Sequence, residues 1–122
     1  MKKILITGCA GFIGSSAVNY FLKKNFSVIG IDDLSTGNKN VLPTHKNFRF
    51  IKGDCANNND LKKISEKIDI IIHLAGQSSG ELSFYNPLND LERNFLTTVK
   101  LVDFYLKKKS KQFIYASSMS VY

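Results

Sequence analysis

Short apolar runs alternate along the chain with segments in which apolar residues recur every three or four positions. The runs are rich in Ile, Val, Leu and Phe and end near glycine, aspartate or serine, which is typical of strands buried on both faces. The expected strands are residues 3–7, 27–31, 48–51, 69–74 and 112–117. The segments between them predict helices over residues 12–22, 57–68 and 87–109, the last one long and substantially buried, with Pro87 at its first position.

This alternation predicts an α/β fold, because strands joined by helices pair in parallel and the helices cover both faces of the sheet. We expect a Rossmann-type doubly wound parallel sheet with strand order 3-2-1-4-5, formed by residues 1–122 as one domain. Ligands of such sheets bind at the carboxyl ends of the strands, so functional residues are expected there.

The first of these ends carries a glycine-rich loop, Gly8-Cys9-Ala10-Gly11-Phe12-Ile13-Gly14. Gly8 would allow a sharp turn, Gly11 a close approach of a pyrophosphate to the backbone, and Gly14 close packing of the helix. The unpaired N–H groups and the dipole at the start of that helix attract phosphates. A merely structural turn is the alternative, but the position between a buried strand and a helix favours dinucleotide binding.

An aspartate closes the second strand, eighteen residues after Gly14. A carboxylate at this place accepts hydrogen bonds from the adenine ribose hydroxyls and repels a 2′-phosphate. Asp33 adds negative charge beside Asp32, and no arginine follows nearby, so both residues favour NAD over NADP. A carboxylate that only caps the following loop is the alternative for Asp32.

The formal net charge is +7, from 17 Lys and Arg against 10 Asp and Glu. The lysines are scattered, and the densest run, residues 107–109, falls where a helix ends and cations are favourable. Because Arg49 and Arg93 are the only arginines, we expect no nucleic-acid partner. We also expect no membrane span, no metal site, and a cytoplasmic protein in which Cys9 and Cys55 stay reduced.

Four motifs then follow one another in the order of a known family. The glycines are spaced Gly-x-x-Gly-x-x-Gly, Gly53-Asp54 follows the third strand, His73-Leu74-Ala75-Gly76 follows the fourth, and residues 115–122 read Tyr-Ala-Ser-Ser-Met-Ser-Val-Tyr. With these motifs the chain closely resembles, over essentially its whole length, the NAD-dependent epimerase/dehydratase family of the extended short-chain dehydrogenase/reductase superfamily.

The resemblance implies bound NAD and a residue for each part of it. The pyrophosphate would be held by Gly8, Gly11, Phe12, Ile13 and Gly14, and the adenosine ribose by Asp32, with Asp33, Thr36 and Gly37 close by. The adenine would meet Asp54 and Cys55, and the pyrophosphate and nicotinamide ribose would pass over Leu74, Ala75 and Gly76. The nicotinamide would lie beside Ser117, and the helix would bring Asn94 near the cofactor, unless Asn94 is an ordinary polar helix residue.

Proteins similar to this chain act on nucleotide-activated sugars, and NAD takes a hydride from a sugar carbon while a tyrosine takes the hydroxyl proton. The resemblance makes Ser118 the catalytic serine that hydrogen-bonds the reacting sugar hydroxyl. No Tyr-x-x-x-Lys pair follows Ser118, and the pairs Tyr20/Lys24 and Tyr105/Lys109 lie on the wrong helices. We therefore expect these 122 residues to be the N-terminal, inactive part of a longer enzyme that forms a homodimer.

Several alternatives remain open at the level of sequence. The full protein is expected to be a nucleotide-sugar epimerase/dehydratase, and the alternatives are a reductase of the same superfamily and a non-catalytic NAD-sensing module. The sequence does not separate an epimerase from a 4,6-dehydratase. Similar dehydratases typically carry Asp-Glu directly after the catalytic serine or threonine. Ser118 is followed by Met119-Ser120, which mildly favours an epimerase or reductase. The segment 77–84 is either a substrate-facing loop or a solvated one, and His73 is expected to be structural.

Overall fold

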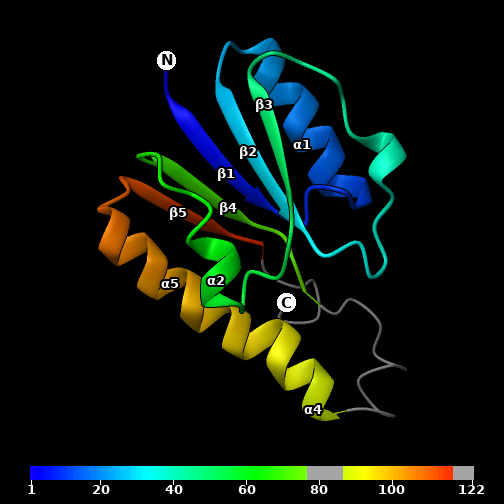
Figure 1. The fold of residues 1–122 in the computed structure, drawn as a ribbon, viewed down its shortest axis with the longest axis vertical. Helices are drawn as coiled ribbons and strands as arrows, with labels where there is room; N and C mark the ends of the chain where they lie inside the picture. The colour runs from blue at the N-terminus through cyan, green and yellow to red at the C-terminus, as the bar shows by residue number, and fades with distance from the viewer. Residues whose placement is uncertain (77–86, 117–122) are drawn as a thin grey trace.

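The computed structural model of the chain describes residues 1–76 and 87–116. Its strands form one five-stranded parallel sheet in the order β3-β2-β1-β4-β5, which confirms the predicted topology (Figure 1). The strands are β1 (Lys3–Thr7), β2 (Ser27–Asp32), β3 (Phe48–Lys52), β4 (Ile70–His73) and β5 (Gln112–Tyr115). All carboxyl ends therefore lie along one edge, where the expected functional residues meet.

Helices cover both faces of this sheet, with α1 on one face and α2 and α5 on the other (Figure 1). The helical elements are α1 (Phe12–Lys23), η1 (Lys39–Val41), α2 (Asn58–Leu61), α4 (Pro87–Asp90), η2 (Leu91–Leu96) and α5 (Thr97–Lys108). The last three follow one another directly along the chain, and η2 is a π-helical segment between two α-helical ones.

The alternation of side chains along the strands divides the core into two layers. Leu5 and Ile71 belong to the cluster beneath α2 and α5, whereas Ile4 and Ile72 belong to the cluster beneath α1. Successive residues of a strand point to opposite faces, so a strand covered on both sides must be apolar at every position. This explains why the strands read as continuous apolar runs.

Two helix predictions need correction. Residues 57–68 form only the short helix α2 and turns, although the three apolar residues with helical spacing, Leu61, Ile64 and Ile68, are all buried. The helical spacing indicates only that these side chains are buried. A series of turns can bury them as well as a helix can. The short helix is capped by the Asn57 side chain, which accepts from the Asn59 N–H at 2.8 Å, and the turn after it is closed by the Ile64 N–H, which donates to the Leu61 carbonyl at 3.1 Å.

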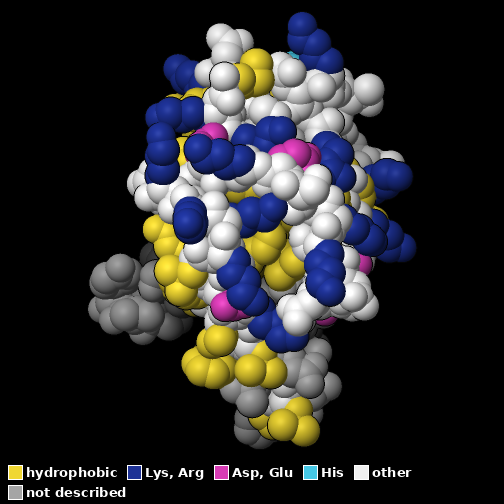
Figure 2. Space-filling view, turned by 60° about the vertical axis from the view of Figure 1, so that its left-hand side comes forward, with side chains coloured by type: hydrophobic (Ala, Val, Ile, Leu, Met, Phe, Trp, Pro, Cys, Tyr) yellow, Lys and Arg dark blue, Asp and Glu magenta, His cyan; other side chains and the backbone are white. Residues whose placement is uncertain are grey.

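The segment 87–109 is helical, but the prediction that it is substantially buried is wrong. The buried residues of α5 are Thr97, Leu101 and Phe104, whereas Val99 and Leu106 are 49% and 64% exposed. Figure 2 shows apolar side chains on the surface at the lower end of the molecule, where α4 lies. The apolar residues of this segment therefore lie on two faces of the helix, and only one of these faces contacts the sheet.

The charge distribution follows the expectation that lysines cover solvated helix ends. Lys107 and Lys108 lie in the last turn of α5, and the C-cap residue that follows, Lys109, has a left-handed conformation. Figure 2 shows Lys and Arg side chains dispersed over the face drawn there. In the part of the chain that the structure describes, no helix has the length and apolar character needed to cross a bilayer.

Candidate functional site

A cavity of about 930 Å³ opens at the carboxyl ends of the strands, between the glycine loop, the loops after β2, β3 and β4, and the start of α5. The structure brings together there most of the residues expected to bind a cofactor. These are Gly8, Gly11, Phe12, Ile13, Gly14, Asp32, Asp33, Thr36, Gly37, Asp54, Cys55, Leu74, Ala75 and Gly76. Asn94, in η2, is not among the lining residues, and Ser117 and Ser118 lie outside the described residues.

The glycine loop depends on two close approaches of backbone to backbone. Gly8 has φ +69°, and a Cβ there would lie 2.9 Å from the backbone nitrogen of Ala75. A Cβ on Gly14 would overlap the carbonyl oxygen of Gly8, so the first turn of α1 folds directly onto the loop. Only glycine meets both conditions without displacing the backbone. Gly14 thus permits a close approach, but the nearest atoms, those of Gly8 and Cys9, belong to the glycine loop and not to the sheet on which close packing was expected.

The start of α1 forms a part of the cavity that has the features of an anion site. No side chain caps this helix, whose N-cap residue is Gly11, and the first turn of a helix has N–H groups without intrahelical acceptors. A Cβ on Gly11 would meet only the Gly8 carbonyl oxygen, at 3.4 Å, so the space in front of this residue is open. Phe12 and Ile13 are 90% and 67% exposed beside it. These features fit the pyrophosphate of a dinucleotide.

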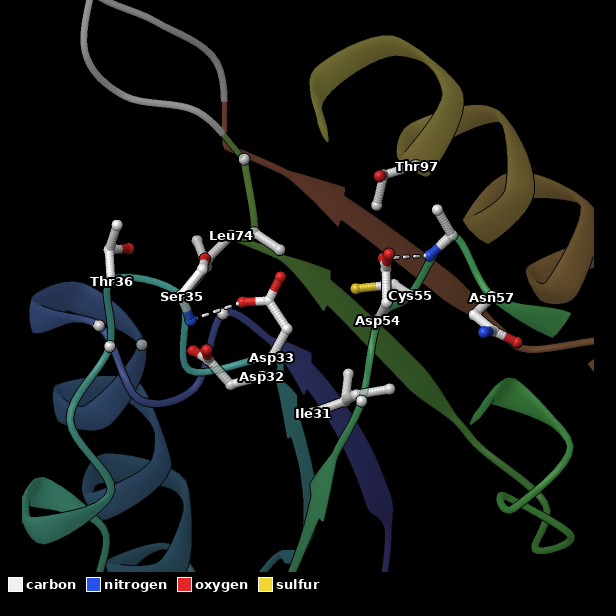
Figure 3. Close-up of a pocket in the computed structure, with 18 of the residues that line it drawn as sticks. Ile31, Asp32, Asp33, Ser35, Thr36, Asp54, Cys55, Asn57, Leu74 and Thr97 are labelled. Carbon is white, nitrogen blue, oxygen red and sulfur yellow. Dashed lines mark hydrogen bonds between the residues drawn. The ribbon is translucent and has the colours of Figure 1, made fainter. Parts of the chain in front are cut away.

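Asp32 lies at the end of β2 and is held by backbone groups on both sides. Its Oδ2 accepts from the Ala10 N–H at 2.9 Å, and its Oδ1 accepts from the Leu34 N–H at 2.8 Å. Asp32 thus caps its own loop, as the alternative supposed, and also ties this loop to the glycine loop. A carboxylate has about four lone-pair sites, so two are left for further donors such as ribose hydroxyls. Asp33 lies next to it and accepts from the Ser35 N–H (Figure 3).

Asp54 and Cys55 lie across the cavity from Asp32, at the end of β3 (Figure 3). The Asp54 carboxylate accepts from the Ala56 N–H at 2.8 Å, which orders the turn after the strand. The Ala56 carbonyl in turn accepts from Nζ of Lys100 at 2.7 Å, so α5 is joined to this loop. Burial, and then the charge of Asp54, raise the pKa of the Cys55 thiol to about 12.

The other thiol at this edge, Cys9, is in a similar environment. Burial, and then the charge of Asp32, raise its pKa to about 12. Both thiols therefore stay protonated at neutral pH and are poor nucleophiles. Both are free and buried, in agreement with the expectation of reduced cysteines. Within the described residues no group of His, Cys, Asp and Glu side chains could hold a metal ion.

The loop after β4 closes the remaining side of the cavity. The hydroxyl of Thr7, at the end of β1, accepts from the backbone N–H groups of Leu74 and Ala75 at 3.0 and 3.1 Å. The same hydroxyl is 2.7 Å from Nδ1 of His73. His73 is 2% exposed, and burial lowers its pKa to about 4, so the imidazole is neutral at physiological pH. The expectation of a structural histidine therefore agrees with its burial.

Sequence reasoning missed the part of the cavity formed by α5. Thr97 and Lys100 line it and are one turn apart on the helix. The spacing of three residues places them on one face, but only the packing of α5 against the sheet shows that this face borders the cavity. Further lining residues that the motifs did not indicate are Ile31, Ser35, Gly53, Ala56, Asn57, Asn58, Leu96 and Ala116.

The two Tyr-x-x-x-Lys pairs lie away from the cavity, as expected. Tyr20 is 56% exposed on α1, with Nζ of Lys24 5.7 Å from its ring centroid. Tyr105 packs edge-on against Phe113, with 5.6 Å between the ring centroids. Neither pair is among the residues that line the cavity.

A parallel sheet in this order, with a glycine loop that leads into an uncapped helix, defines a protein of the Rossmann class. Comparison with family models narrows this class. The model described as the NAD dependent epimerase/dehydratase family matches residues 4–122, and the chain belongs to this family.

Individual relatives carry out more than one type of reaction. The dTDP-D-glucose 4,6-dehydratase of Dictyostelium discoideum is 39% identical over 130 residues, which cover 100% of this chain and 30% of the relative. The epimerase Mth375 of Methanothermobacter thermautotrophicus has 33% identity and a TM-score of 0.94, covering 97% of this chain and 35% of that one. The UDP-glucose 4-epimerase of Thermus thermophilus, solved in complex with NAD, has 28% identity and a TM-score of 0.87, with coverages of 95% and 37%. The chain thus spans about a third of the length of these relatives.

Proposed function

We propose that this chain is the NAD-binding part of an enzyme that interconverts nucleotide sugars through transient hydride transfer to NAD and back. The observation that carries the proposal is the geometry at one end of the sheet. The uncapped start of α1, beside Gly11, opens into the same cavity as the carboxylate of Asp32. A pyrophosphate and a ribose are the two chemical groups that these features suit.

Each wall of the cavity suits one part of the cofactor. The N–H groups at the start of α1 would bind the pyrophosphate, and Asp32 would accept from the adenosine ribose. Asp54 and Cys55 would border the adenine, and the loop after β4, residues 74–76, would pass beneath the pyrophosphate towards the nicotinamide. When bound, NAD supplies a hydride acceptor that is regenerated within the same turnover.

The charges around the cavity support a preference for NAD over NADP. Asp32 and Asp33 lie together at the ribose end, where a 2′-phosphate would bring two further negative charges close to them (Figure 3). Lys100 is the cation that lines the described part of the cavity, and it comes from α5, next to the loop that follows Asp54. A 2′-phosphate would therefore be repelled by the two carboxylates at the ribose end.

For the chemical step we propose that Ser118 hydrogen-bonds the reacting hydroxyl of the sugar and orients it. Ala116, which directly precedes the segment containing Ser118, lines the cavity at the end of β5. We favour an epimerase, because Met119-Ser120 offers no carboxylate pair next to Ser118 for loss of water. The general base would come from a part of the enzyme outside this chain, since neither Tyr-x-x-x-Lys pair borders the cavity.

We also propose that the complete enzyme is a homodimer in the cytoplasm. The outer face of the helical segment carries Phe95, Val99, Val102 and Leu106, which are exposed at spacings of four, three and four residues. This spacing forms an apolar stripe suited to helix pairing with a second subunit. The two free thiols, Cys9 and Cys55, suit a reducing compartment.

Titration of the chain with NAD and, separately, NADP tests the proposed cofactor site. The unfolding entropy of a protein of 122 residues is about 0.26 kcal/mol per K. NAD at 100 times its Kd stabilises by about 2.7 kcal/mol, so the expected rise in Tm is about 10 °C. NADP at the same concentration should produce a much smaller rise.

Two matched variants connect this result to the cavity. Asp32→Ser should reduce the NAD-dependent rise in Tm, whereas Asp103→Ser, a carboxylate removed from the exposed side of α5, should leave it unchanged. A cooperative melt that neither dinucleotide shifts would overturn the proposal. Equal stabilisation by NAD and NADP would overturn only the preference for NAD.

A further inference from the structure

The imidazole of His73 is enclosed at the end of β4, which lies between β1 and β5 in the sheet. It is 2% exposed, and the rings of Phe113 and Tyr115 on β5 lie 6.3 and 5.8 Å from it, centroid to centroid. Both ring nitrogens nevertheless have a hydroxyl partner, Thr7 on β1 and Thr98 on α5. A side chain that only fills space in the core needs no polar partners, whereas both nitrogens of this buried histidine have one, each from a different element.

The bonds of Thr7 determine which ring nitrogen carries the hydrogen. Its hydroxyl oxygen accepts from the N–H groups of Leu74 and Ala75, of which the Leu74 N–H also reaches the Thr7 carbonyl at 3.3 Å. Among the described contacts of this hydroxyl, Nδ1 of His73 is the acceptor, so the hydroxyl hydrogen points to Nδ1. Nδ1 is therefore unprotonated, and in a neutral imidazole the hydrogen is then on Nε2.

The contacts of Thr98, on the other side of the ring, also place the hydrogen on Nε2. Its hydroxyl donates to the Asn94 carbonyl at 2.6 Å, so its oxygen is free to accept from Nε2–H of His73 at 3.0 Å. Donors and acceptors thus alternate without conflict along the chain Thr7–His73–Thr98–Asn94. Burial, which lowers the pKa of His73 to about 4, favours the same neutral ring.

This chain of hydrogen bonds joins two segments of the proposed cofactor site. At one end, Thr7 holds the backbone of Leu74 and Ala75, which line the cavity. At the other end, Thr98 donates to the Asn94 carbonyl of η2, the π-helical segment that ends at the cavity-lining residue Leu96 and is followed by Thr97, which also lines the cavity. π-helical turns occur frequently at functional sites, where they change the direction of the following residues.

We propose that His73 is a positioning residue for cofactor binding: as the Nε2–H tautomer it couples the loop after β4 to the start of α5, and so sets the width of the cavity between them. This proposal rests on the proposed NAD site. Protonation of the ring would direct an Nδ1–H at a hydroxyl oxygen that already accepts two N–H groups. Of the described groups that contact the ring from β1, β5 and α5, Tyr115 is the one that can ionise, so no carboxylate there would stabilise the cation.

Nitrogen NMR of the histidine side chains tests the tautomer in the unliganded chain. The sequence has two histidines, and His45, exposed in the loop before β3, provides the reference signal. His73 is expected to show an unprotonated Nδ1 and a protonated Nε2 at pH 7, with slow exchange of the Nε2 hydrogen with water. A protonated Nδ1 would overturn the proposal, whether or not NAD binds.

Variants of Thr98 test the coupling, because this residue does not line the cavity. Thr98→Val keeps the shape but removes the acceptor for Nε2–H, and Thr98→Ser restores the hydroxyl. Because one hydrogen bond contributes about 0.5–1.5 kcal/mol, Thr98→Val should weaken NAD binding by about 2- to 10-fold, and Thr98→Ser should return it close to wild type. His45→Asn is the control for a histidine change outside the cavity.

The outcomes separate the two proposals. Wild-type affinity for NAD in a folded Thr98→Val variant would overturn the coupling and leave the NAD site standing. Absence of NAD binding in the wild-type chain would overturn the proposed function and the coupling together. If Thr98→Val does not fold, the NMR measurement on the wild-type chain still decides whether the ring has the required tautomer.

Discussion

Replacing Gly14 by alanine tests whether the first turn of α1 must lie against the glycine loop. A Cβ there would overlap the carbonyl oxygen of Gly8 and lie 2.8 Å from its carbonyl carbon and 2.9 Å from the Cα of Cys9. These are backbone atoms, so no side-chain rotation relieves the overlap. Overpacking costs about 1–3 kcal/mol, and we take the upper end for this reason. Alanine regains about 1 kcal/mol of helix propensity, which leaves a net loss of about 2 kcal/mol.

With an unfolding entropy of about 0.26 kcal/mol per K for 122 residues, this loss lowers Tm by about 8 °C. Calorimetric melting measures the stability, and titration with NAD measures the binding. Gly11→Ala is the matched control, because its Cβ would meet only the Gly8 carbonyl oxygen, at 3.4 Å. It should change Tm by no more than about 2 °C. It should still weaken NAD binding, since its methyl group would occupy the space in front of the helix start.

The two variants together can refute the reasoning. A Gly14→Ala protein that melts within about 2 °C of wild type would show that the close approach is not required. If both variants lost the same amount in Tm, the loss would come from any substitution at the start of the helix and not from the close approach at Gly14. A Gly11→Ala protein that binds NAD with wild-type affinity would mean that the open space before α1 is not where the pyrophosphate lies.

Three further predictions concern the rest of the site and its surroundings. Since burial lowers the pKa of His73 to about 4 from 6.5, the neutral ring contributes stability that is complete above pH 6.5 and is lost as pH falls towards 4. Urea unfolding of wild type against His73→Asn should show an excess loss of up to about 3 kcal/mol over this interval, and parallel pH curves would contradict it. Lys100→Met removes the bond to the loop after Asp54 and should weaken NAD binding by about 2- to 10-fold in calorimetry, whereas Lys107→Met, on the exposed side of α5, should not. Val99→Glu should shift any concentration-dependent self-association seen by sedimentation towards the monomer, and an unchanged profile would exclude this face as the contact.

The strand pattern predicted the fold because burial on both faces leaves little freedom in the sequence of a central strand. Ile4, Leu5 and Ile6 contribute alternately to the two core layers, so the run has no polar position. The helices were less predictable, because a spacing of three or four between apolar residues does not determine what packs against those residues. In residues 57–68 it reflects short turns against the sheet, and in residues 87–109 it includes a face that the sheet does not cover.

The site was predictable to the extent that its residues lie at the ends of strands. A residue directly after a buried strand must emerge at the carboxyl edge, so Gly8, Asp32 and Asp54 could be placed together without knowledge of packing. Lys100 could not, since its position depends on how α5 lies across the sheet. The π-helical turn in η2 was also beyond reach, because no glycine or proline between Leu91 and Leu96 marks it.

The bonds that shape the cavity are made within the protein and do not require a ligand. Each oxygen of Asp32 already accepts one backbone N–H, so the carboxylate is oriented before any ribose hydroxyl arrives. The loop after β4 is likewise held by Thr7, which is itself fixed by pairing of β1 with β2 and β4. The conformational entropy of ordering these groups is therefore lost when the sheet folds and does not weaken binding. A consequence is that stability and affinity are linked at Asp32. A substitution there removes the proposed ligand for the ribose and also two hydrogen bonds, one of which joins its loop to the glycine loop. The change in NAD affinity must therefore be compared with the change in Tm of the unliganded chain before it is assigned to the lost contact.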